Sequence, residues 1–297
     1  MPGSQELPII WHPSPNFGER PADSTIDMLV LHYTGMPSGE MALERMCDPA
    51  SQVSAHYMIE EDGCIYQLVA ETKRAWHAGR GQWRGCSDVN SRSIGIEIVN
   101  PGHEFGYRPF AVQQIDALKA LCKAILARHD IPAHHIIAHS DMAPDRKEDP
   151  GELFPWQQLA AEGIGLWPDE EAINPPSKTE KTAENTDQST YHDDQVSTAI
   201  AAGEHYPPQN TAALSESDAG THRPNPAEDA TSSKHEHTDC EALFDSLLLQ
   251  FGYGPGDPIH NRVAFQRHWR PSCLNGHADA QSIAILKDLI AQCPPTA

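Results

Sequence analysis

The chain has 297 residues, of which 42 are acidic and 21 basic, so its net charge is −21 when histidine is neutral. Such an acidic surface repels phosphate backbones, and we therefore expect no nucleic-acid partner. The apolar runs are far shorter than the roughly 20 residues of a membrane-spanning helix, and the first residues lack the pattern of a signal peptide. The seven cysteines include no Cys-x-x-Cys pair. They predict neither a dense disulfide framework nor a zinc ribbon.

Strand-like and helix-like patterns alternate in the first half of the chain. An almost continuous apolar run over residues 26–33 predicts a strand that is covered on both faces. Residues 93–99 alternate between isoleucine and other residues, which predicts a second strand. Helical spacing over residues 111–129 predicts a helix, and residues 135–139 predict another short strand. We therefore expect an α/β domain with a mixed central sheet flanked by helices.

Composition divides the rest of the chain. Residues 1–25 are interpreted as an N-terminal extension of a catalytic domain over residues 26–168. Residues 169–239 contain 15 acidic and 4 basic side chains, with no Trp or Phe, and so cannot bury enough apolar surface to offset the entropy of ordering. This segment is predicted to be an acidic, disordered linker.

Residues 240–297 become apolar again, and the spacing of their large side chains predicts a small module of three helices. Two interpretations of this module remain open. A 71-residue flexible linker has an r.m.s. span on the order of 45 Å, so the module can act as a tethered anchor. Alternatively, the helices fold back and complete the catalytic core.

Two of the 17 histidines follow predicted strands and are candidates for a metal site. His32 lies near the end of the first apolar strand, and His139 ends the short strand before a polar loop. A hydrolytic zinc site needs three ligands, usually His and carboxylate, that converge and leave one position for water. Each histidine alone is equally consistent with an ordinary core or surface residue, and spacing does not choose among them.

Five ordered motifs select the site. They are Leu-Val-Leu-His-Tyr-Thr (29–34), Ser-Ala-His-Tyr (54–57), Arg-Ala-Trp-His-Ala-Gly (74–79), Ser-Ile-Gly-Ile-Glu (93–97) and His-Ser-Asp-Met-Ala-Pro with Asp-Pro-Gly (139–151). In this order they resemble the type-2 N-acetylmuramoyl-L-alanine amidases, whose fold is shared with the peptidoglycan-recognition proteins. The C-terminal module resembles, more loosely, a helical peptidoglycan-binding domain, through Phe-Gly-Tyr-Gly (251–254) and the segment 264–271.

The resemblance implies a role for each matching residue. His32, His139 and Asp149 correspond to the ligands of one Zn²⁺ per chain. Glu97 corresponds to the general base, and Lys147 to the cation that stabilises the oxyanion. The sequence departs from the family at Asp145, where close relatives carry Gly in the ligand loop.

Four further residues are candidates for binding the substrate. Trp76 and His77 correspond to residues of the muropeptide groove, although Trp76 is equally consistent with a core position. Asn90 and Arg92 precede the strand of Glu97 and can contact the carboxylates of the peptide stem, or cap local structure instead.

The resemblance implies an enzyme of bacterial peptidoglycan turnover that hydrolyses the amide bond between N-acetylmuramic acid and L-alanine. The alternative is a non-catalytic peptidoglycan sensor, a class that typically lacks one or more ligands. The substrate is polymeric peptidoglycan or soluble muropeptide. The wall-binding resemblance favours the cell envelope as the site of action, whereas the missing leader favours the cytoplasm.

Overall fold

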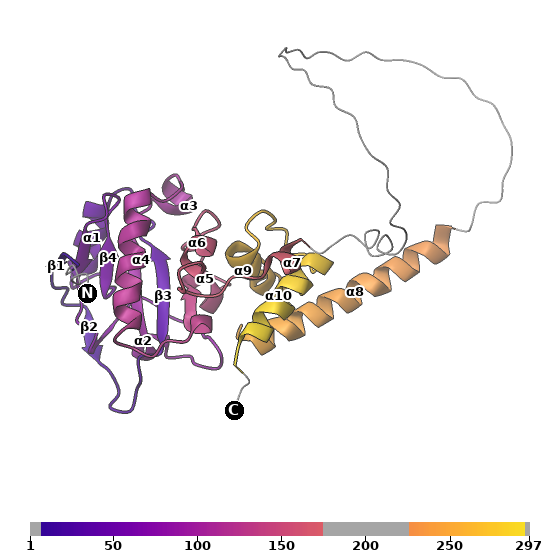
Figure 1. Ribbon diagram of the computed structural model, residues 1–297, viewed down its shortest axis with the longest axis horizontal. Helices are drawn as coiled ribbons and strands as arrows, with labels where there is room; N and C mark the ends of the chain where they lie inside the picture. Colours follow the sequence, from indigo (N-terminus) through magenta and orange to yellow (C-terminus); the bar gives the residue numbers. More distant parts are fainter. Residues whose placement is uncertain (1–6, 175–225, 295–297) are drawn as a thin grey trace, which may run out of the picture. The chain divides into compact units, whose positions relative to one another are not determined.

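A six-stranded mixed sheet forms the centre of the protein in the computed structural model, which describes residues 7–174 and 226–294 (Figure 1). In spatial order its strands are β1 (Ile9–Trp11), β5 (Ile65–Gln67), β4 (Tyr57–Ile59), β7 (Ser93–Ile98), β3 (Met28–Tyr33) and β8 (Ile136–Ala138). Strands β4 and β5 run antiparallel, and the other neighbours run parallel. Strands β2 (Phe17–Glu19) and β6 (Lys73–Ala75) form a separate antiparallel pair.

The three strands predicted in the first half of the chain are present as β3, β7 and β8. The apolar run at 26–33 becomes β3, which lies between β7 and β8 in the middle of the parallel part of the sheet. Helix α4 (Val112–Leu126) confirms the helix expected over 111–129. The mixed α/β fold class is therefore confirmed.

One face of the sheet is covered by α4, which Figure 1 shows running along the strands. Alternation in β3 and β7 turns Leu29 and Leu31, together with Ile94, Ile96 and Ile98, toward this face. They pack with Leu118, Leu121 and Ile125 of α4 in one buried cluster. Alternation therefore leaves His32 and Glu97, which are register partners, for the opposite face.

Two buried apolar clusters cover the opposite face of the sheet. Helix α1 (Gly39–Cys47), which begins at the capping residue Ser38, packs with β4 through Ala42, Met46 and Met58. Further along the sheet, side chains from the C-terminal helices join Met28 and Val30 of β3 in another buried cluster. The side chains of His32 and Glu97 lie at the carboxyl ends of the strands on this face.

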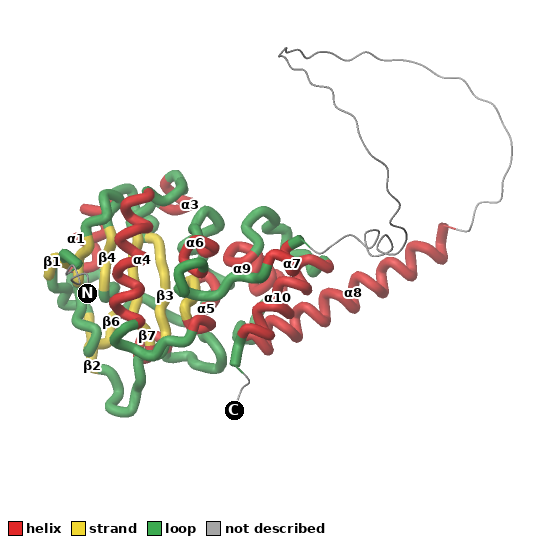
Figure 2. The backbone as a smooth tube through the Cα atoms, viewed as in Figure 1, coloured by secondary structure: helices red, strands yellow, loops and turns green. Residues whose placement is uncertain are grey.

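The three predicted C-terminal helices are α8 (Pro226–Phe251), α9 (Pro258–Trp269) and α10 (Ala280–Gln292) (Figure 2). Asp257 and Asp279 cap α9 and α10 by accepting backbone N–H bonds, and Pro258 at the first position of α9 needs no such bond. No helix in the described part of the chain is long and apolar enough to cross a membrane.

The C-terminal helices belong to the same folded unit as residues 1–175. Phe244, Phe251 and Phe265 share a buried cluster with Trp83 and Met142 of the first domain. This arrangement differs from the freely tethered module and agrees with the alternative, in which the helices complete the catalytic core. The shared cluster explains the difference, because the apolar faces of these helices bury against the sheet domain.

The linker predicted over residues 169–239 lies largely outside the described residues. At its two ends the structure has helix α7 (Glu170–Ile173) and the first turns of α8.

The sequence pattern did not reveal helix α1, which has nine residues. The other elements that it did not reveal are short. They are the three-residue strands β1, β2, β4, β5 and β6, and the helices α2 (Val89–Arg92), α3 (Gly102–Phe105), α5 (His139–Met142), α6 (Trp156–Ala160) and the 3₁₀ turn Ala133–His135. Elements of three to five residues are too short to display a period.

Candidate active site

The three candidate metal ligands meet at the carboxyl ends of neighbouring strands. His32 is the fifth residue of β3, and His139 is the first residue of α5, directly after β8. Because β3 and β8 are parallel neighbours, both histidines reach the same edge of the sheet. Asp149 lies in the loop after α5. All three are buried, with 1%, 3% and 5% of their surface exposed.

The three ligand atoms converge on one point. His32 Nδ1 lies 2.9 Å from His139 Nδ1, and each nitrogen lies 3.0 Å from Asp149 Oδ2. In the described part of the chain, this is the group of His, Cys, Asp or Glu side chains whose spacing suits a metal ion.

The surroundings of His139 decide which of its nitrogens carries a proton. Its Nε2 lies 2.9 Å from the carbonyl oxygen of Ala78, which is an acceptor only. Nε2 must therefore carry the hydrogen, so that Nδ1 of the neutral ring has a free lone pair. Arg146 Nη2 donates to the same carbonyl at 2.6 Å and helps to hold it in place.

A chain of three hydrogen bonds decides the same question for His32. Ser93 Oγ donates to the carbonyl of Val89 at 2.7 Å and therefore accepts from His77 Nε2 at 3.1 Å. The unprotonated His77 Nδ1 then accepts from His32 Nε2 at 3.0 Å. His32 Nδ1 is left with a free lone pair, like that of His139.

This set of atoms fits a cation. Two imidazole lone pairs and a carboxylate oxygen lie about 3 Å apart with no proton assigned between them, which is repulsive until a positive charge joins them. Burial, followed by the nearby His139, lowers the pKa of His32 to about 4. A neutral imidazole and a carboxylate are the forms that bind a metal.

Gly95 makes room for the hydrogen-bond chain. A Cβ atom at this position would lie 2.4 Å from Cγ of the His77 ring. Glycine in the Ser-Ile-Gly-Ile-Glu motif is therefore required for the ring of His77 to lie against β7, between Ser93 and His32.

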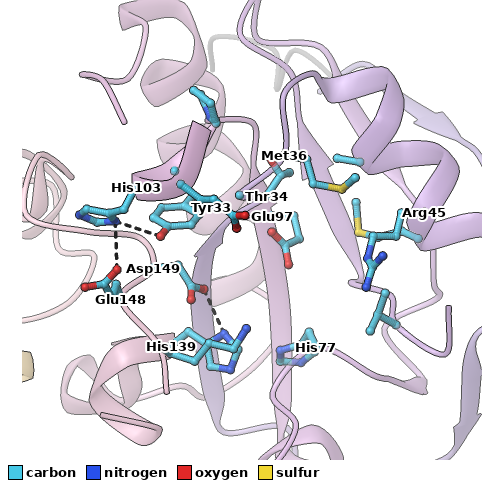
Figure 3. Close-up of a pocket in the computed structure, with 18 of the residues that line it drawn as sticks. Tyr33, Thr34, Met36, Arg45, His77, Glu97, His103, His139, Glu148 and Asp149 are labelled. Atoms are coloured by element: carbon cyan, nitrogen blue, oxygen red, sulfur yellow. Dashed lines mark hydrogen bonds and ion pairs between the residues drawn. The ribbon is translucent and has the colours of Figure 1, made fainter. Parts of the chain in front are cut away.

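Glu97 faces the same cavity as the ligands (Figure 3). It is the register partner of His32 on β7, and its Oε2 is buried without a hydrogen-bond partner. Burial, and then the charge of Asp149, raise the pKa of Glu97 well above its ordinary value, while Lys147 opposes them. A half-buried carboxylate with a raised pKa and an enclosed, free Oε2 is suited to accepting a proton from a bound molecule.

The cavity around these residues has a volume of about 360 Å³. Lys147 lines it and is half-buried, in the loop between α5 and Asp149. Trp76, also half-buried, is a further lining residue. The cavity is therefore lined by the carboxylate of Glu97, by the ammonium group of Lys147 and by two candidate ligands, His139 and Asp149.

Of the other three predicted substrate contacts, Asn90 and Arg92 do not line the cavity. His77 lines the cavity, but its ring is engaged by His32 and Ser93. The side-chain oxygen of Asn90 accepts from the backbone N–H groups of His77 and Ala78, which agrees with a structural role. Arg92 pairs with Asp27 at the amino end of β7, away from the carboxyl ends where the ligands meet, and does not line the cavity.

Asp145 does not disturb the ligand loop. Its φ angle is not among the positive values of the described residues, so the loop does not need the glycine of the relatives at this position. Its carboxylate pairs with Arg80 at 3.1 Å on the surface.

Sequence reasoning missed a polar group on the opposite rim of the cavity. Tyr33 Oη lies 3.0 Å from His103 Nδ1, and His103 Nε2 lies 3.1 Å from a carboxylate oxygen of Glu152 (Figure 3 shows Tyr33 and His103). Tyr33 follows the ligand His32 directly, which was the available signal. His103 lies on the four-residue helix α3 and Glu152 in a turn, and neither segment has a recognisable pattern.

Comparisons with known proteins identify relatives of this chain. The family model described as N-acetylmuramoyl-L-alanine amidase matches residues 22–152. The N-acetylmuramoyl-L-alanine amidase AmiD of Escherichia coli is 34% identical over 283 residues, which are 89% of this chain and 82% of the relative. The 1,6-anhydro-N-acetylmuramyl-L-alanine amidase AmpD of the same species is 37% identical over 164 residues, covering 50% of this chain and 87% of AmpD.

Two solved structures resemble most of the chain. The structure of E. coli AmiD in complex with the substrate anhydro-N-acetylmuramic acid-L-Ala-D-γ-Glu-L-Lys has a TM-score of 0.64 at 30% identity, and covers 93% of this chain and 98% of its own. AmpDh3 of Pseudomonas aeruginosa has a TM-score of 0.63 at 26% identity, with 92% and 95% covered. Ordered motifs, fold and full-length similarity agree, and this chain belongs to the N-acetylmuramoyl-L-alanine amidase family.

Proposed function

We propose that this chain hydrolyses the amide bond between N-acetylmuramic acid and L-alanine with one zinc ion held by His32, His139 and Asp149. The observation that carries the proposal is the convergence of three buried lone pairs, about 3 Å apart, beside the unpartnered oxygen of Glu97. Two histidines and a carboxylate are a ligand set of catalytic zinc sites. When bound, zinc supplies a Lewis acid that activates water and polarises a carbonyl.

The protein's own groups handle the proton and the charge. Glu97 Oε2 accepts a proton from the attacking water and delivers it to the nitrogen of L-alanine as the amide bond breaks. Its raised pKa suits both steps, because the carboxyl group must hold the proton between them. The ammonium group of Lys147 stabilises the negative charge that develops on the carbonyl oxygen. The products are the lactyl carboxylate of the sugar and the free amine of the peptide.

The test is a turnover assay on a purified muropeptide with zinc content measured in parallel. We expect one zinc per chain, loss of activity on chelation and recovery when zinc is returned. Activity that survives complete removal of metal would refute the zinc-dependent mechanism. Binding of muropeptide without cleavage by the zinc-loaded protein would favour the sensor instead.

We propose that the enzyme acts in the bacterial cell envelope on the peptides of peptidoglycan. The support is the similarity along the whole chain, C-terminal helices included, to AmiD, whereas AmpD matches only half of it. Binding of the wall by the C-terminal helices remains a prediction. Assays of the protein on intact sacculi and on soluble anhydro-muropeptide, with fractionation of cells, separate this proposal from a cytoplasmic role in recycling. Activity confined to the soluble substrate, with the protein in the cytoplasm, would refute the proposed site of action.

A further inference from the structure

Asp141 connects the sheet domain to the C-terminal helices through hydrogen bonds. It is completely buried, two residues after the ligand His139 and on the same short helix, α5. Its Oδ1 accepts from Tyr253 Oη at 2.7 Å, and its Oδ2 accepts from His268 Nδ1 at 2.7 Å. Tyr253 follows α8 and His268 lies on α9, so both donors come from the C-terminal helices. We refer to these three residues as the Asp141 cluster.

The geometry of the cluster is tightly constrained. Tyr253 and His268 are 3% and 2% exposed. The imidazole of His268 stacks between Trp156 and Trp269, with ring centroids 3.7 and 3.6 Å away, which directs Nδ1 at the carboxylate. Burial and the neighbouring carboxylate raise the pKa of Tyr253 well above its ordinary value, so its hydroxyl group remains a donor.

Asp141 also has a local role. Its Oδ2 accepts from the backbone N–H of Ala138 at 2.8 Å, at the start of α5. This bond alone would explain an aspartate here, but it leaves most of the carboxylate's acceptor sites without partners in a buried position. A buried charge of this kind is costly unless several donors surround it. The two donors from the C-terminal helices supply what α5 cannot supply itself.

A second, weaker contact reaches the other end of the ligand loop. Arg267, next to His268 on α9, pairs with Glu148 at 3.2 Å and with Glu152 at 3.5 Å. Glu148 directly precedes the ligand Asp149 but is half exposed, so this ion pair contributes less than the buried cluster. Contacts from α9 therefore reach both ends of the loop that carries His139 and Asp149.

Apolar packing does not by itself require these polar contacts. The shared cluster that contains Met142 and Phe265 already buries the C-terminal helices against the sheet domain. Polar bonds add direction, because a carboxylate held by three donors fixes the position of α5 more narrowly than apolar contact does. Ligand atoms must be held to within about 0.5 Å for a metal site to bind tightly.

We propose that Tyr253 and His268 are positioning residues of the metal site, which hold α5 through Asp141 and so set the affinity for zinc. The C-terminal helices are then part of the catalytic centre as well as a covering of the sheet. This inference rests on the proposed function, since it requires that the site binds zinc.

The test compares two variants of the full chain. Tyr253→Phe keeps the ring and removes the hydroxyl group that reaches Asp141. Leu286→Ala, in the same apolar cluster on α10 but outside the Asp141 cluster, is the matched control for a less stable interface. The measurements are zinc affinity by competition with a chelator, the visible spectrum of the cobalt-loaded protein, and the melting temperature without metal.

We expect Tyr253→Phe to weaken zinc binding about tenfold, the lower end for partners that support metal ligands, and to change the cobalt spectrum. Leu286→Ala should lower the melting temperature and leave zinc affinity within twofold of the unaltered protein. Unchanged affinity in Tyr253→Phe would overturn the inference. An equal loss in both variants would also overturn it, since affinity would then follow stability alone.

A second pair of variants serves if Tyr253→Phe does not fold. His268→Asn keeps an N–H donor close to the position of Nδ1, whereas His268→Leu removes it. We expect Asn to retain more zinc affinity than Leu, and equal affinities would overturn the inference. An unaltered protein that binds no zinc would overturn the proposed function as well, whereas equal binding by the unaltered and Tyr253→Phe proteins overturns only the role of the cluster.

Discussion

Replacing Glu97 by Gln should abolish most of the activity and make the metal-free protein more stable. Glutamine has nearly the same shape but carries neither a charge nor a basic oxygen. Loss of a general base typically reduces turnover by roughly 10² or more. Glu97 also lowers the free energy of unfolding, because its Oε2 is buried without a hydrogen-bond partner and burial raises its pKa.

The size and pH dependence of the stability gain follow from that environment. A buried polar atom without a partner costs about 1–3 kcal/mol, and more when charged. Because the amide of glutamine keeps part of this cost, we expect a gain of about 1 kcal/mol, or about 2–4 °C in Tm for a domain of this size.

With a folded-state pKa above 4.5, the native protein loses stability as pH rises from 4.5 through that pKa. The advantage of Gln is therefore small below pH 4.5, grows over that range and is constant above it.

The assay combines turnover of muropeptide, zinc content and thermal unfolding of the metal-free protein at pH 5 and pH 8. Glu44→Gln, at an exposed position on α1, is the control and should change neither activity nor stability. Near-normal turnover of Glu97→Gln would refute its role as the base. A lower Tm at pH 8 would refute the assignment of an unfavourable buried carboxylate.

Three further outcomes test the site and the fold. Lys147→Met should retain zinc by elemental analysis yet lose turnover by roughly 10², and full turnover would remove it from the oxyanion site. His139→Ala removes one of three ligands and should abolish zinc binding at ordinary concentrations, so full occupancy would exclude it as a ligand. Burial would raise the pKa of Glu71, but hydrogen bonds from Arg128, His129 and Tyr57 outweigh it and lower that pKa to about 2. Glu71→Gln should therefore cost about 1–2 kcal/mol at neutral pH, and this difference should disappear as pH falls from 4.5 to about 2, as measured by urea unfolding; a difference that persists at pH 2 would contradict this.

The sequence predicted the central elements because their patterns are long enough to read. The apolar run of β3 and the alternation of β7 place His32 and Glu97 at the carboxyl ends of adjacent parallel strands. Resemblance was still needed to choose His32 and His139 among the histidines, since a strand end alone does not identify a ligand.

Features that depend on distant contacts were not predicted. The position of the His77 ring between His32 and Ser93 depends on the space left by Gly95, and no local pattern shows it. The contact of His77 with substrate stays a prediction. Asp141 was part of a recognised motif, but its partner His268 lies 127 residues away. A periodicity analysis reads one segment at a time, and such separations are invisible to it.

The separation of 127 residues between Asp141 and His268 also has a consequence for synthesis. At about 5–20 residues per second, a ribosome needs roughly 6–25 s to make the chain between them. For most of that interval the emerging sheet domain contains His32 and His139 but lacks Phe251 and Phe265, which cover Trp83 and Met142 in the folded protein. The apolar side chains of the sheet domain in this cluster therefore stay uncovered until the C-terminal helices are made, and the contact between Asp141 and His268 can form only after that.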